Sequence, residues 1–195
     1  RFGKNNRWGM FPSASAGWYI SEEDFMKDQK FFDYLKLRAS WGRLGNENAL
    51  GYYDFQALIS SYNTYYGGYV QGSGSNPWAG AVAWNMERND LKWETTISRN
   101  LGLDFGFLNN RINGSLEIYW NTTKDLLMAV PVDNTTGYSY QFQNFGKTSN
   151  RGIELSLNFD VINKGDFRFN IGAIYNYNRN KLDELPNADQ YLYSS

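Results

Sequence analysis

The sequence lacks cysteine and histidine altogether, and only 4 of its 195 residues are proline. Without these side chains the chain can form no disulfide scaffold, Cys/His zinc site, thiol nucleophile or Ser-His-Asp triad. It also lacks any run of about 18 apolar residues, which a transmembrane helix needs. Nor is charge of one sign in excess, because 19 basic and 20 acidic side chains leave a net charge of −1. That balance gives no electrostatic basis for binding nucleic acid, and we expect no such partner.

Aromatic residues and glycine are abundant instead. The chain has 7 Trp, 15 Tyr and 13 Phe, together 18% of its residues, and 19 Gly. This composition, which is also rich in asparagine, favours β-strands joined by polar turns. The first residues contain neither an initiator Met nor the apolar segment of a signal peptide, so we expect a mature or excised piece of protein.

Alternation of apolar and polar residues with a period of two is the main pattern in the chain. In 151–161, for example, Ile153, Leu155 and Leu157 alternate with Glu154 and Ser156. A helix would show a period near 3.6, so these segments predict antiparallel β-strands. The pattern occurs in six segments: 12–20, 34–42, 93–107, 112–121, 151–161 and 167–178.

The alternation fits two kinds of protein, a membrane β-barrel and a soluble β-sandwich or barrel with its apolar face inward. Strand lengths of about 9–13 residues favour the barrel, because a tilted membrane strand needs about that many. The connections also alternate: 43–92 and 122–150 are long, whereas 108–111 and 162–166 are short. Short periplasmic turns and long extracellular loops are typical of outer-membrane barrels. Aromatic residues near the ends of the apolar stripes agree with interfacial girdles.

The connections carry predictions of their own. We expect residues 21–33 to form a helical turn with Ser21 as its N-cap, and 108–111 and 162–166 to form tight hairpin turns. Asn113-Gly114 could form a turn, but the alternation begins at Ile112, so we assign it to a strand. Within 43–92, short strands are expected at 55–59 and 65–70.

Two groups of residues are candidate functional sites. The first is a set of aromatic side chains in the loop 43–92, which could stack on sugar rings, pack the loop itself or meet a partner protein: Tyr65, Tyr66, Trp78 and Trp84. The second is a set of charged side chains on the polar strand faces, which would line a barrel interior: Lys36, Arg38, Glu94, Asp104, Glu117, Glu154, Asp160 and Arg168. They could contact a plug or tune the passage of polar solutes, but plain solvation of the wall is the favoured interpretation.

Arg99 breaks the pattern, because it falls on the apolar side of its segment. An arginine facing lipid at the bilayer midplane costs about 2–4 kcal/mol, so we expect it near a rim, or a bulge that shifts the register. The acidic pairs Glu22/Glu23 and Asp183/Glu184 resemble glycosidase carboxylates only superficially, because adjacent acids in a charged turn are usually solvated. We predict no catalytic residue, no metal ligand and no cofactor, hence no enzyme.

Several ordered stretches resemble the SusC/RagA family of TonB-linked outer-membrane proteins. Residues 11–23 (FPSASAGWYISEE) and 35–46 (LKLRASWGRLGN) are similar to two adjoining stretches of that family. Further matches are LKWE at 91–94, NLGLDF at 100–105, LNNRI at 108–112 and NRGIEL at 150–155. The matches run from about residue 8 to about residue 182 in family order, which is more specific than any single motif.

The resemblance implies an all-β fold: antiparallel transmembrane strands with long extracellular loops, part of an outer-membrane barrel of about 22 strands. It also implies import of glycans or peptides through the outer membrane of a Gram-negative bacterium, with outer-membrane lipid around the barrel. A SusD-like surface lipoprotein would cover it, and the TonB complex would act through an N-terminal region. Residues 1–195 show no plug, TonB box or barrel-closing C-terminal strand, so we expect a partial barrel domain. The alternative is a soluble secreted β-sandwich that binds carbohydrate through the loop aromatics.

Overall fold

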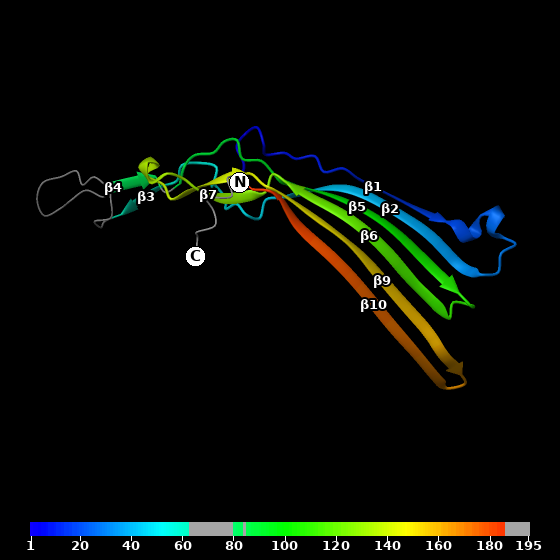
Figure 1. The fold of residues 1–195 in the computed structure, drawn as a ribbon. Coiled ribbons are helices and arrows are strands. Elements are labelled where there is room, and N and C mark those ends of the chain that lie inside the picture. Colours follow the sequence, from blue (N-terminus) through cyan, green and yellow to red (C-terminus); the bar gives the residue numbers. More distant parts are fainter. Residues whose placement is uncertain (63–79, 84, 186–195) are drawn as a thin grey trace, which may run out of the picture.

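The main feature of the computed structural model is one curved antiparallel sheet of six strands (Figure 1). The structure describes residues 1–62, 80–83 and 85–185. The strand order is β1-β2-β5-β6-β9-β10, so strands adjacent in the sheet follow one another along the chain apart from two inserted hairpins. The strands are β1 (Ser13–Tyr19), β2 (Phe32–Asn46), β5 (Glu94–Phe107), β6 (Ile112–Lys124), β9 (Lys147–Lys164) and β10 (Phe167–Glu184).

All six alternating segments form strands of this sheet, as their period predicts. Several strands extend beyond the predicted limits, and β9 and β10 reach 18 residues each. Asn113 and Gly114 lie inside β6, paired with Gly106 and Phe105 of β5, so their assignment to a strand is confirmed. Alternation defines the middle of each strand better than its ends, because the ends contain polar residues on both faces.

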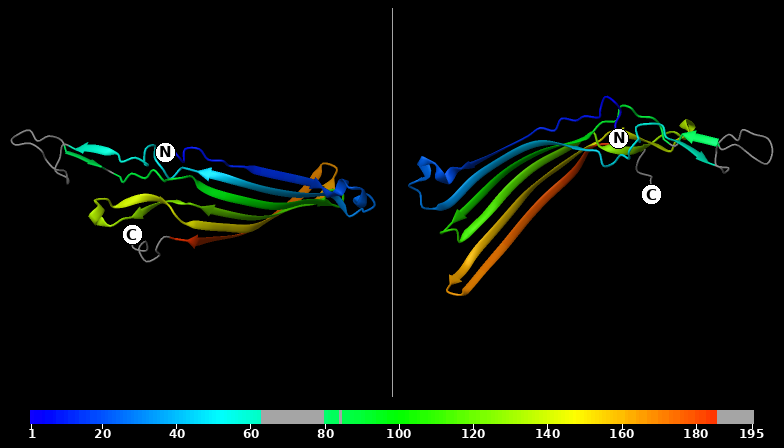
Figure 2. Two further views of the ribbon diagram at one scale, coloured as in Figure 1. Left: turned by 90° about the horizontal axis from the view of Figure 1, so that it is seen from above. Right: turned by 180° about the vertical axis from the view of Figure 1, so that it is seen from behind.

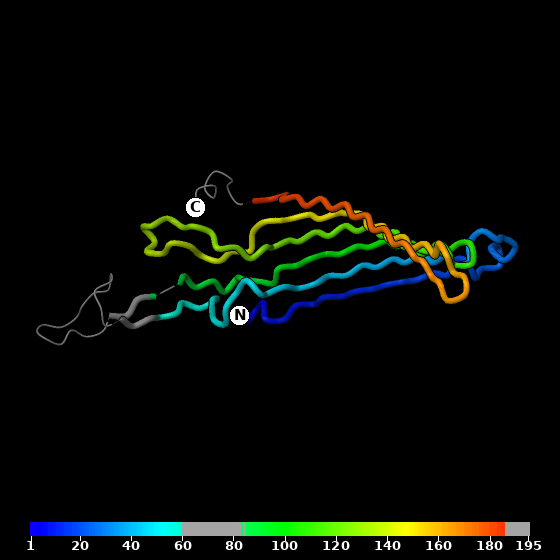
Figure 3. Tube along the Cα trace, turned by 90° about the horizontal axis from the view of Figure 1, so that it is seen from below, coloured from blue at the N-terminus to red at the C-terminus, as the bar shows by residue number. Residues whose placement is uncertain are grey.

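The two ends of the sheet differ in their connections (Figures 2 and 3). Tight turns join β5 to β6 and β9 to β10 at one end. At the other, long-loop end, each long connection contains a small hairpin: β3 (Ile59–Tyr62) with β4 (Gly80–Ala83), and β7 (Leu127–Pro131) with β8 (Tyr140–Asn144). The strand predicted at 55–59 is wrong, since β3 begins only at Ile59. The one predicted at 65–70 lies outside the described residues, and β7 and β8 were not predicted.

The tight turn 108–111 places three consecutive non-glycine residues in the left-handed region. The φ angles of Leu108, Asn109 and Asn110 are 56°, 58° and 58°. Asparagine tolerates this conformation better than other side chains. The amide N–H of Asn110 also donates to Asp33 Oδ2 at 2.9 Å, which joins the turn to the start of β2. The predicted tight turn is therefore confirmed.

Between β1 and β2 the chain forms two short 3₁₀ turns, η1 (Ile20–Glu22) and η2 (Asp24–Met26). The prediction of Ser21 as an N-cap is wrong, because Ser21 lies inside η1 and no side chain caps either turn. The polar groups have other partners: Trp18 Nε1 donates to Glu23 Oε1 at 2.7 Å. The Gln29 side chain accepts from the N–H of Phe32, the first residue of β2, at 2.8 Å.

The buried apolar side chains lie at the long-loop end, not under the sheet. Five of them form a cluster that we call the loop core: Phe2, Leu50, Phe55, Leu91 and Leu127. Leu91 is 0% exposed, and Trp93 and Phe142 pack against the cluster. The N-terminal segment and both long connections therefore fold against one another.

Asparagine side chains join these segments by pairing with main-chain groups. Asn144 donates through Nδ2 to the carbonyls of Lys92 (2.7 Å) and Asp125 (3.0 Å), and its Oδ1 accepts from Lys92 N at 2.8 Å. Asn85 donates to the Asp54 and Gln56 carbonyls and accepts from Leu58 N. These bonds satisfy loop main-chain groups that no strand ladder pairs.

The sheet exposes the apolar face of its strands. Leu101 is 40% exposed, Ile171 47% and Tyr175 59%. A β-sandwich would cover this face with a second sheet, but the described residues form only two small hairpins besides the main sheet. No helix in the described part of the chain has the length and apolarity to cross a membrane. The exposed face therefore argues against the soluble sandwich.

Arg99 stays on this apolar face. Its register partners are Trp41 on β2 and Trp120 on β6, and the pairing of β5 with β6 is continuous along its whole length. The only irregularity between β2 and β5 lies at Phe32/Tyr34, at the opposite end of the strands. A bulge at Arg99 is thus excluded, and its place near the rim remains the explanation.

Candidate functional site: the polar wall of the sheet

The eight charged residues predicted to line a barrel interior all occupy the polar face of the sheet. In the antiparallel register, residues paired across strands point to the same side. The pairs Lys36–Asp104, Arg38–Gly102, Gly102–Glu117 and Glu117–Glu154 place five of the eight side by side near the middle. We call these five the polar-wall cluster: Lys36, Arg38, Asp104, Glu117 and Glu154.

Arg38 is the centre of the polar-wall cluster. Its guanidinium donates from Nε to Asp104 Oδ2 at 2.8 Å and from Nη2 to Asp104 Oδ1 at 2.9 Å. Nη2 also lies 3.6 Å from Glu117 Oε2. One arginine on β2 thus bridges carboxylates on β5 and β6, in the two-pronged geometry that arginine favours with carboxylates. Because the side chains are partly exposed, each ion pair contributes about 0–1 kcal/mol to stability.

Gly102 gives the Arg38 side chain its path across β5. A Cβ at Gly102 would lie 2.8 Å from Arg38 Nη2 and 2.9 Å from its Cζ. Gly17 on the other side of Arg38 leaves similar space for Lys36, whose Cε would lie 3.2 Å from an added Cβ. The glycines on the polar strand faces therefore let long charged side chains lie flat along the wall.

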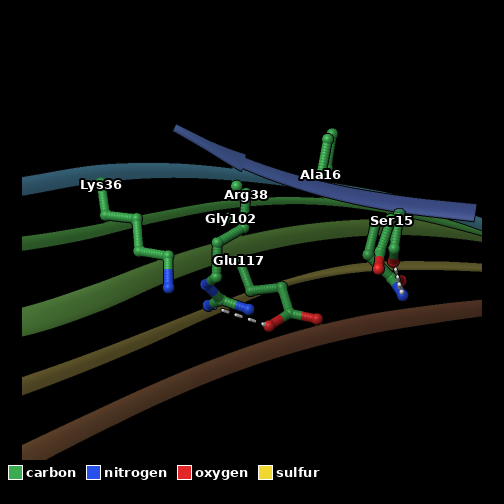
Figure 4. A pocket seen from close by; sticks show the side chains of 10 residues that line it. Ser15, Ala16, Lys36, Arg38, Gly102 and Glu117 are labelled. Atoms are coloured by element: carbon green, nitrogen blue, oxygen red, sulfur yellow. Dashed lines mark hydrogen bonds and ion pairs between the residues drawn. The ribbon is translucent and has the colours of Figure 1, made fainter. Parts of the chain in front are cut away.

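A shallow depression of about 340 Å³ opens beside Arg38, lined by Ser15, Lys36, Ser40, Asn100 and Glu117 among others. In Figure 4 the side chains of Lys36, Arg38 and Glu117 point to one side of the sheet and that of Ala16 to the other. Lys36 Nζ lies 4.6 Å from the centre of the Tyr19 ring and 3.3 Å from its hydroxyl. The depression offers hydrogen-bond donors and acceptors but no enclosed cavity for a tightly held ligand.

The other three predicted wall residues lie apart from the cluster. Glu94 is at the long-loop end of β5 and accepts from Asn46 Nδ2 at 3.3 Å. Asp160 and Arg168 lie near the turn between β9 and β10, paired with Asn170 and Asn163 respectively. That turn is shorter than the predicted 162–166, because β9 extends to Lys164 and leaves only 165–166 between the strands. All three share the polar face, but strand length separates them from Arg38.

An uncharged part of the same wall was not among the predicted site residues. Neutral polar side chains bond across neighbouring strands towards the long-loop end: Asn100 Nδ2 donates to Ser40 Oγ (3.1 Å), and Ser98 Oγ to Asn121 Oδ1 (2.7 Å). The hydroxyls of Thr96 and Thr123 lie 2.9 Å apart. Their odd or even positions along the strands could have identified them, because these positions place them on the same face as the charged residues.

The loop aromatics proposed for sugar stacking, Tyr65, Tyr66, Trp78 and Trp84, lie outside the described residues. Their role stays a prediction. In the part of the chain that the structure describes, no group of three or more Asp or Glu is placed to hold a metal ion. Asp183 and Glu184, the acidic pair compared above with glycosidase carboxylates, form ion pairs with Lys181 (3.2 Å) and Lys147 (3.5 Å).

Comparison with known proteins identifies the sheet. The family model described as "TonB dependent receptor-like, beta-barrel" matches residues 1–194. The chain belongs to this family of TonB-dependent receptors. Its SusC/RagA character is shown by the relative SusC together with the RagAB structures. TonB-dependent receptor SusC of Bacteroides thetaiotaomicron is 39% identical over 197 residues, covering 99% of this chain and 19% of the relative. TonB-dependent receptor P39 of Formosa agariphila is 38% identical over 191 residues, covering 98% and 17%.

Solved structures agree with this assignment. The chain superposes on the RagAB peptide importer in its "closed-closed" state with a TM-score of 0.81 and 32% identity, covering 95% of this chain and 19% of the other. The "open-open" state gives 0.81 with 31% identity. The chain spans about a fifth of the length of the relatives it matches. Its strands are β-barrel strands of a TonB-dependent receptor, which is an outer-membrane protein of Gram-negative bacteria.

Proposed function

We propose that the chain forms six consecutive wall strands of a TonB-dependent transporter of the SusC/RagA type, which imports glycans. The function is binding and passage of a solute, with no bond chemistry. The observation that carries the proposal is the contrast between the two faces of the sheet. One face is exposed and apolar, whereas the other carries the polar-wall cluster bridged by Arg38. That contrast suits a wall between lipid and a water-filled lumen.

The edges of the sheet support a larger barrel. Strands β1 and β10 each pair on one side only within the described residues. An unpaired strand edge cannot stay in a bilayer, because no water is present to bond its N–H and C=O groups. Further strands from the same receptor would pair with both edges, and residues 1–195 would then be part of a barrel domain.

The partners follow from the orientation of the wall. The loop core and the two long connections would face the cell exterior, where a SusD-like lipoprotein would cover the barrel. The TonB complex would act from the periplasm through the receptor's N-terminal region, using the proton gradient of the inner membrane. Solvation of the polar wall is its simplest role; contact with a plug is the alternative.

The imported solute divides into two classes. Glycans are favoured by the aromatic loop, whose Tyr65, Tyr66, Trp78 and Trp84 could stack on sugar faces. Peptides are the second candidate, because the RagAB structures to which the chain is similar are those of a peptide importer.

Uptake by intact cells tests the proposal. The full-length receptor would be expressed with its lipoprotein partner and offered fluorescent oligosaccharides or peptides of matched size. We expect saturable uptake of one class, lost when a protonophore collapses the gradient. A receptor that reaches the outer membrane yet takes up neither class, in cells whose gradient is intact, would contradict the proposal.

Cysteine labelling tests the two faces directly, because residues 1–195 contain no cysteine. Asn100→Cys on the polar face should react with a water-soluble maleimide in the folded receptor. Leu101→Cys, its neighbour on the apolar face, should react only with a lipid-soluble reagent. Equal reactivity of both sites toward the water-soluble reagent would contradict the barrel-wall arrangement. It would not decide which solute is imported.

A further inference from the structure

A row of arginine and tryptophan residues crosses the apolar face of the sheet. Trp41 pairs with Arg99, Arg99 with Trp120, and Trp120 with Arg151. Arg151 in turn pairs with Arg179 on β10. Since antiparallel partners point to the same side, all five side chains lie on the face that also carries Leu101. We call Arg99, Arg151 and Arg179 the arginine row.

The arginine row marks where the apolar band ends. From the row to the level at which Phe107, Ile112, Phe159 and Ile171 pair across the sheet, the apolar-face positions of four strands carry no charge: Leu101, Leu103, Phe105 and Phe107 on β5, Ile112, Gly114, Leu116 and Ile118 on β6, Ile153, Leu155, Leu157 and Phe159 on β9, and Ile171, Ala173, Tyr175 and Tyr177 on β10. From Arg99 to Phe107, β5 rises about 20 Å along the membrane normal, at about 3.3 Å per residue and a tilt of about 40°. The apolar band of an outer-membrane barrel is about 25 Å tall, so the row lies at its boundary on the long-loop side.

The three arginines have no anionic partner within the described residues. All three are exposed, and none forms one of the salt bridges found there. Arg151 and Arg179 are direct cross-strand partners, and like charges in that position repel. Glu154, which is nearest to Arg151 in the sequence, lies on the opposite, polar face. Asp183 and Glu184, which follow Arg179, pair with Lys181 and Lys147. An anion from outside the chain would remove this repulsion.

A depression of about 240 Å³ lies beside two of these arginines. Its lining includes Trp120, Arg151, Arg179, Ile118, Ile153 and Tyr177, which all belong to the apolar face. Trp120 is 43% exposed there. The site thus has apolar side chains on the side of the tight turns and two guanidinium groups on the side of the long loops. This arrangement suits a molecule with hydrocarbon chains and an anionic head.

We propose that the arginine row binds the phosphate groups of lipids in the outer leaflet of the outer membrane, with the acyl chains against the apolar band. Arginine binds phosphate in a two-pronged geometry, and tryptophan favours the boundary between headgroups and hydrocarbon. The row would set the depth of the barrel in the bilayer and hold a shell of anionic lipid on this side. The inference rests on the barrel fold and does not depend on which solute is imported.

Lipid binding by the purified full-length receptor tests the inference. The probes are lipid A with both phosphates and the same lipid after dephosphorylation, and native mass spectrometry counts the molecules bound. We expect the wild type to retain the phosphorylated lipid several-fold better. The triple variant Arg99→Gln, Arg151→Gln, Arg179→Gln should lose that preference, and the triple lysine variant should keep part of it because charge remains.

A matched control removes three charges at the other end of the strands: Lys27→Gln, Lys30→Gln and Lys164→Gln. It should keep the preference of the wild type. Resistance of each variant to unfolding by heat in detergent gels shows that it folds, and inorganic phosphate added as competitor should not displace the lipid. Displacement by inorganic phosphate would assign a plain anion site instead. An undiminished preference in the triple glutamine variant, or a change of oligomeric state with unchanged lipid binding, would overturn the proposal.

Discussion

The sheet and the loop core use apolar side chains in opposite ways. In the loop core, Leu91 is 0% exposed because the chain itself surrounds it. On the sheet, Leu101 is 40% exposed although it lies at the centre of a regular strand. The loop core shields its apolar side chains from water by packing them against one another, whereas lipid covers the apolar side chains of the sheet. The strand ladder provides order within the sheet, while stability in the loop core depends on packing.

The largest effect of a single substitution is expected in the loop core. Leu91→Ala should destabilise it by about 2–5 kcal/mol, because the vacated volume has no lipid to fill it. Leu101→Ala is the matched control and should cost much less, since lipid chains can occupy the space. Hydrogen exchange of the long connections for Leu91→Ala, and of the sheet strands for Leu101→Ala, measures the two costs in the full-length receptor. Equal costs at both sites would mean that the apolar face packs against protein.

A charge on the sheet should be costly on one face only. Leu155→Arg on the apolar face should destabilise the inserted barrel by about 2–4 kcal/mol, because it places a guanidinium among lipid chains. Its neighbour Ser156→Arg on the polar face should have little effect. Unfolding by denaturant in lipid vesicles measures both. If Ser156→Arg is the more harmful, the assignment of the two faces is reversed.

A smaller effect is expected from crowding within the polar wall. Gly102→Ala should displace the Arg38 guanidinium and weaken its contact with Glu117, by about 1 kcal/mol or less because the pair is exposed. Gly172→Ala is the control, because the nearest atom to its added Cβ is 3.4 Å away. Combining Gly102→Ala with Glu117→Gln tests the cause: the penalty should shrink in the double variant, and a purely additive result would refute this account.

The smallest effect is a pH response in the loops. Arg88 donates to both carboxylate oxygens of Asp90, at 2.7 and 2.6 Å, and this holds the pKa of Asp90 below its ordinary value. Because the pKa of Asp90 is lower in the folded state than in the unfolded state, the Arg88–Asp90 pair stabilises the fold fully at pH values above the ordinary pKa of aspartate. This stabilisation is lost as the pH falls through the pKa that Asp90 has in the folded state. The protection factors of the amides around residues 88–91 should therefore fall only in acid, and Asp90→Asn should abolish that dependence. An acid response that persists in Asp90→Asn would point to another carboxylate.

Prediction from sequence succeeded where the local pattern alone is decisive. Each strand of the sheet was predicted because alternation needs only a face of lipid and a face of water. Prediction failed in the connections: β7 and β8 were not predicted, and Ser21 was wrongly assigned as a helix N-cap. Those segments are short, and their structure depends on partners distant in sequence, such as Asn144 with Lys92.

The candidate site divides in the same way. Parity alone placed Lys36, Arg38 and Glu117 on one face, but it could not separate them from Arg168, which lies at the far end. The register between neighbouring strands decides which of their residues lie opposite one another. That register depends on how the strands pair through main-chain hydrogen bonds, which the sequence alone does not show.

By itself, the sequence determined the class of fold, the two faces of each strand, the position of the tight turn 108–111 and the family resemblance. These depend on side-chain chemistry repeated every second residue. Only the tertiary structure decided that Arg38 bridges Asp104 and Glu117, that the N-terminal segment and both long connections share the loop core, and that Arg99, Arg151 and Arg179 stand in one row. The physical reason is that such groups become neighbours only when several strands align at once.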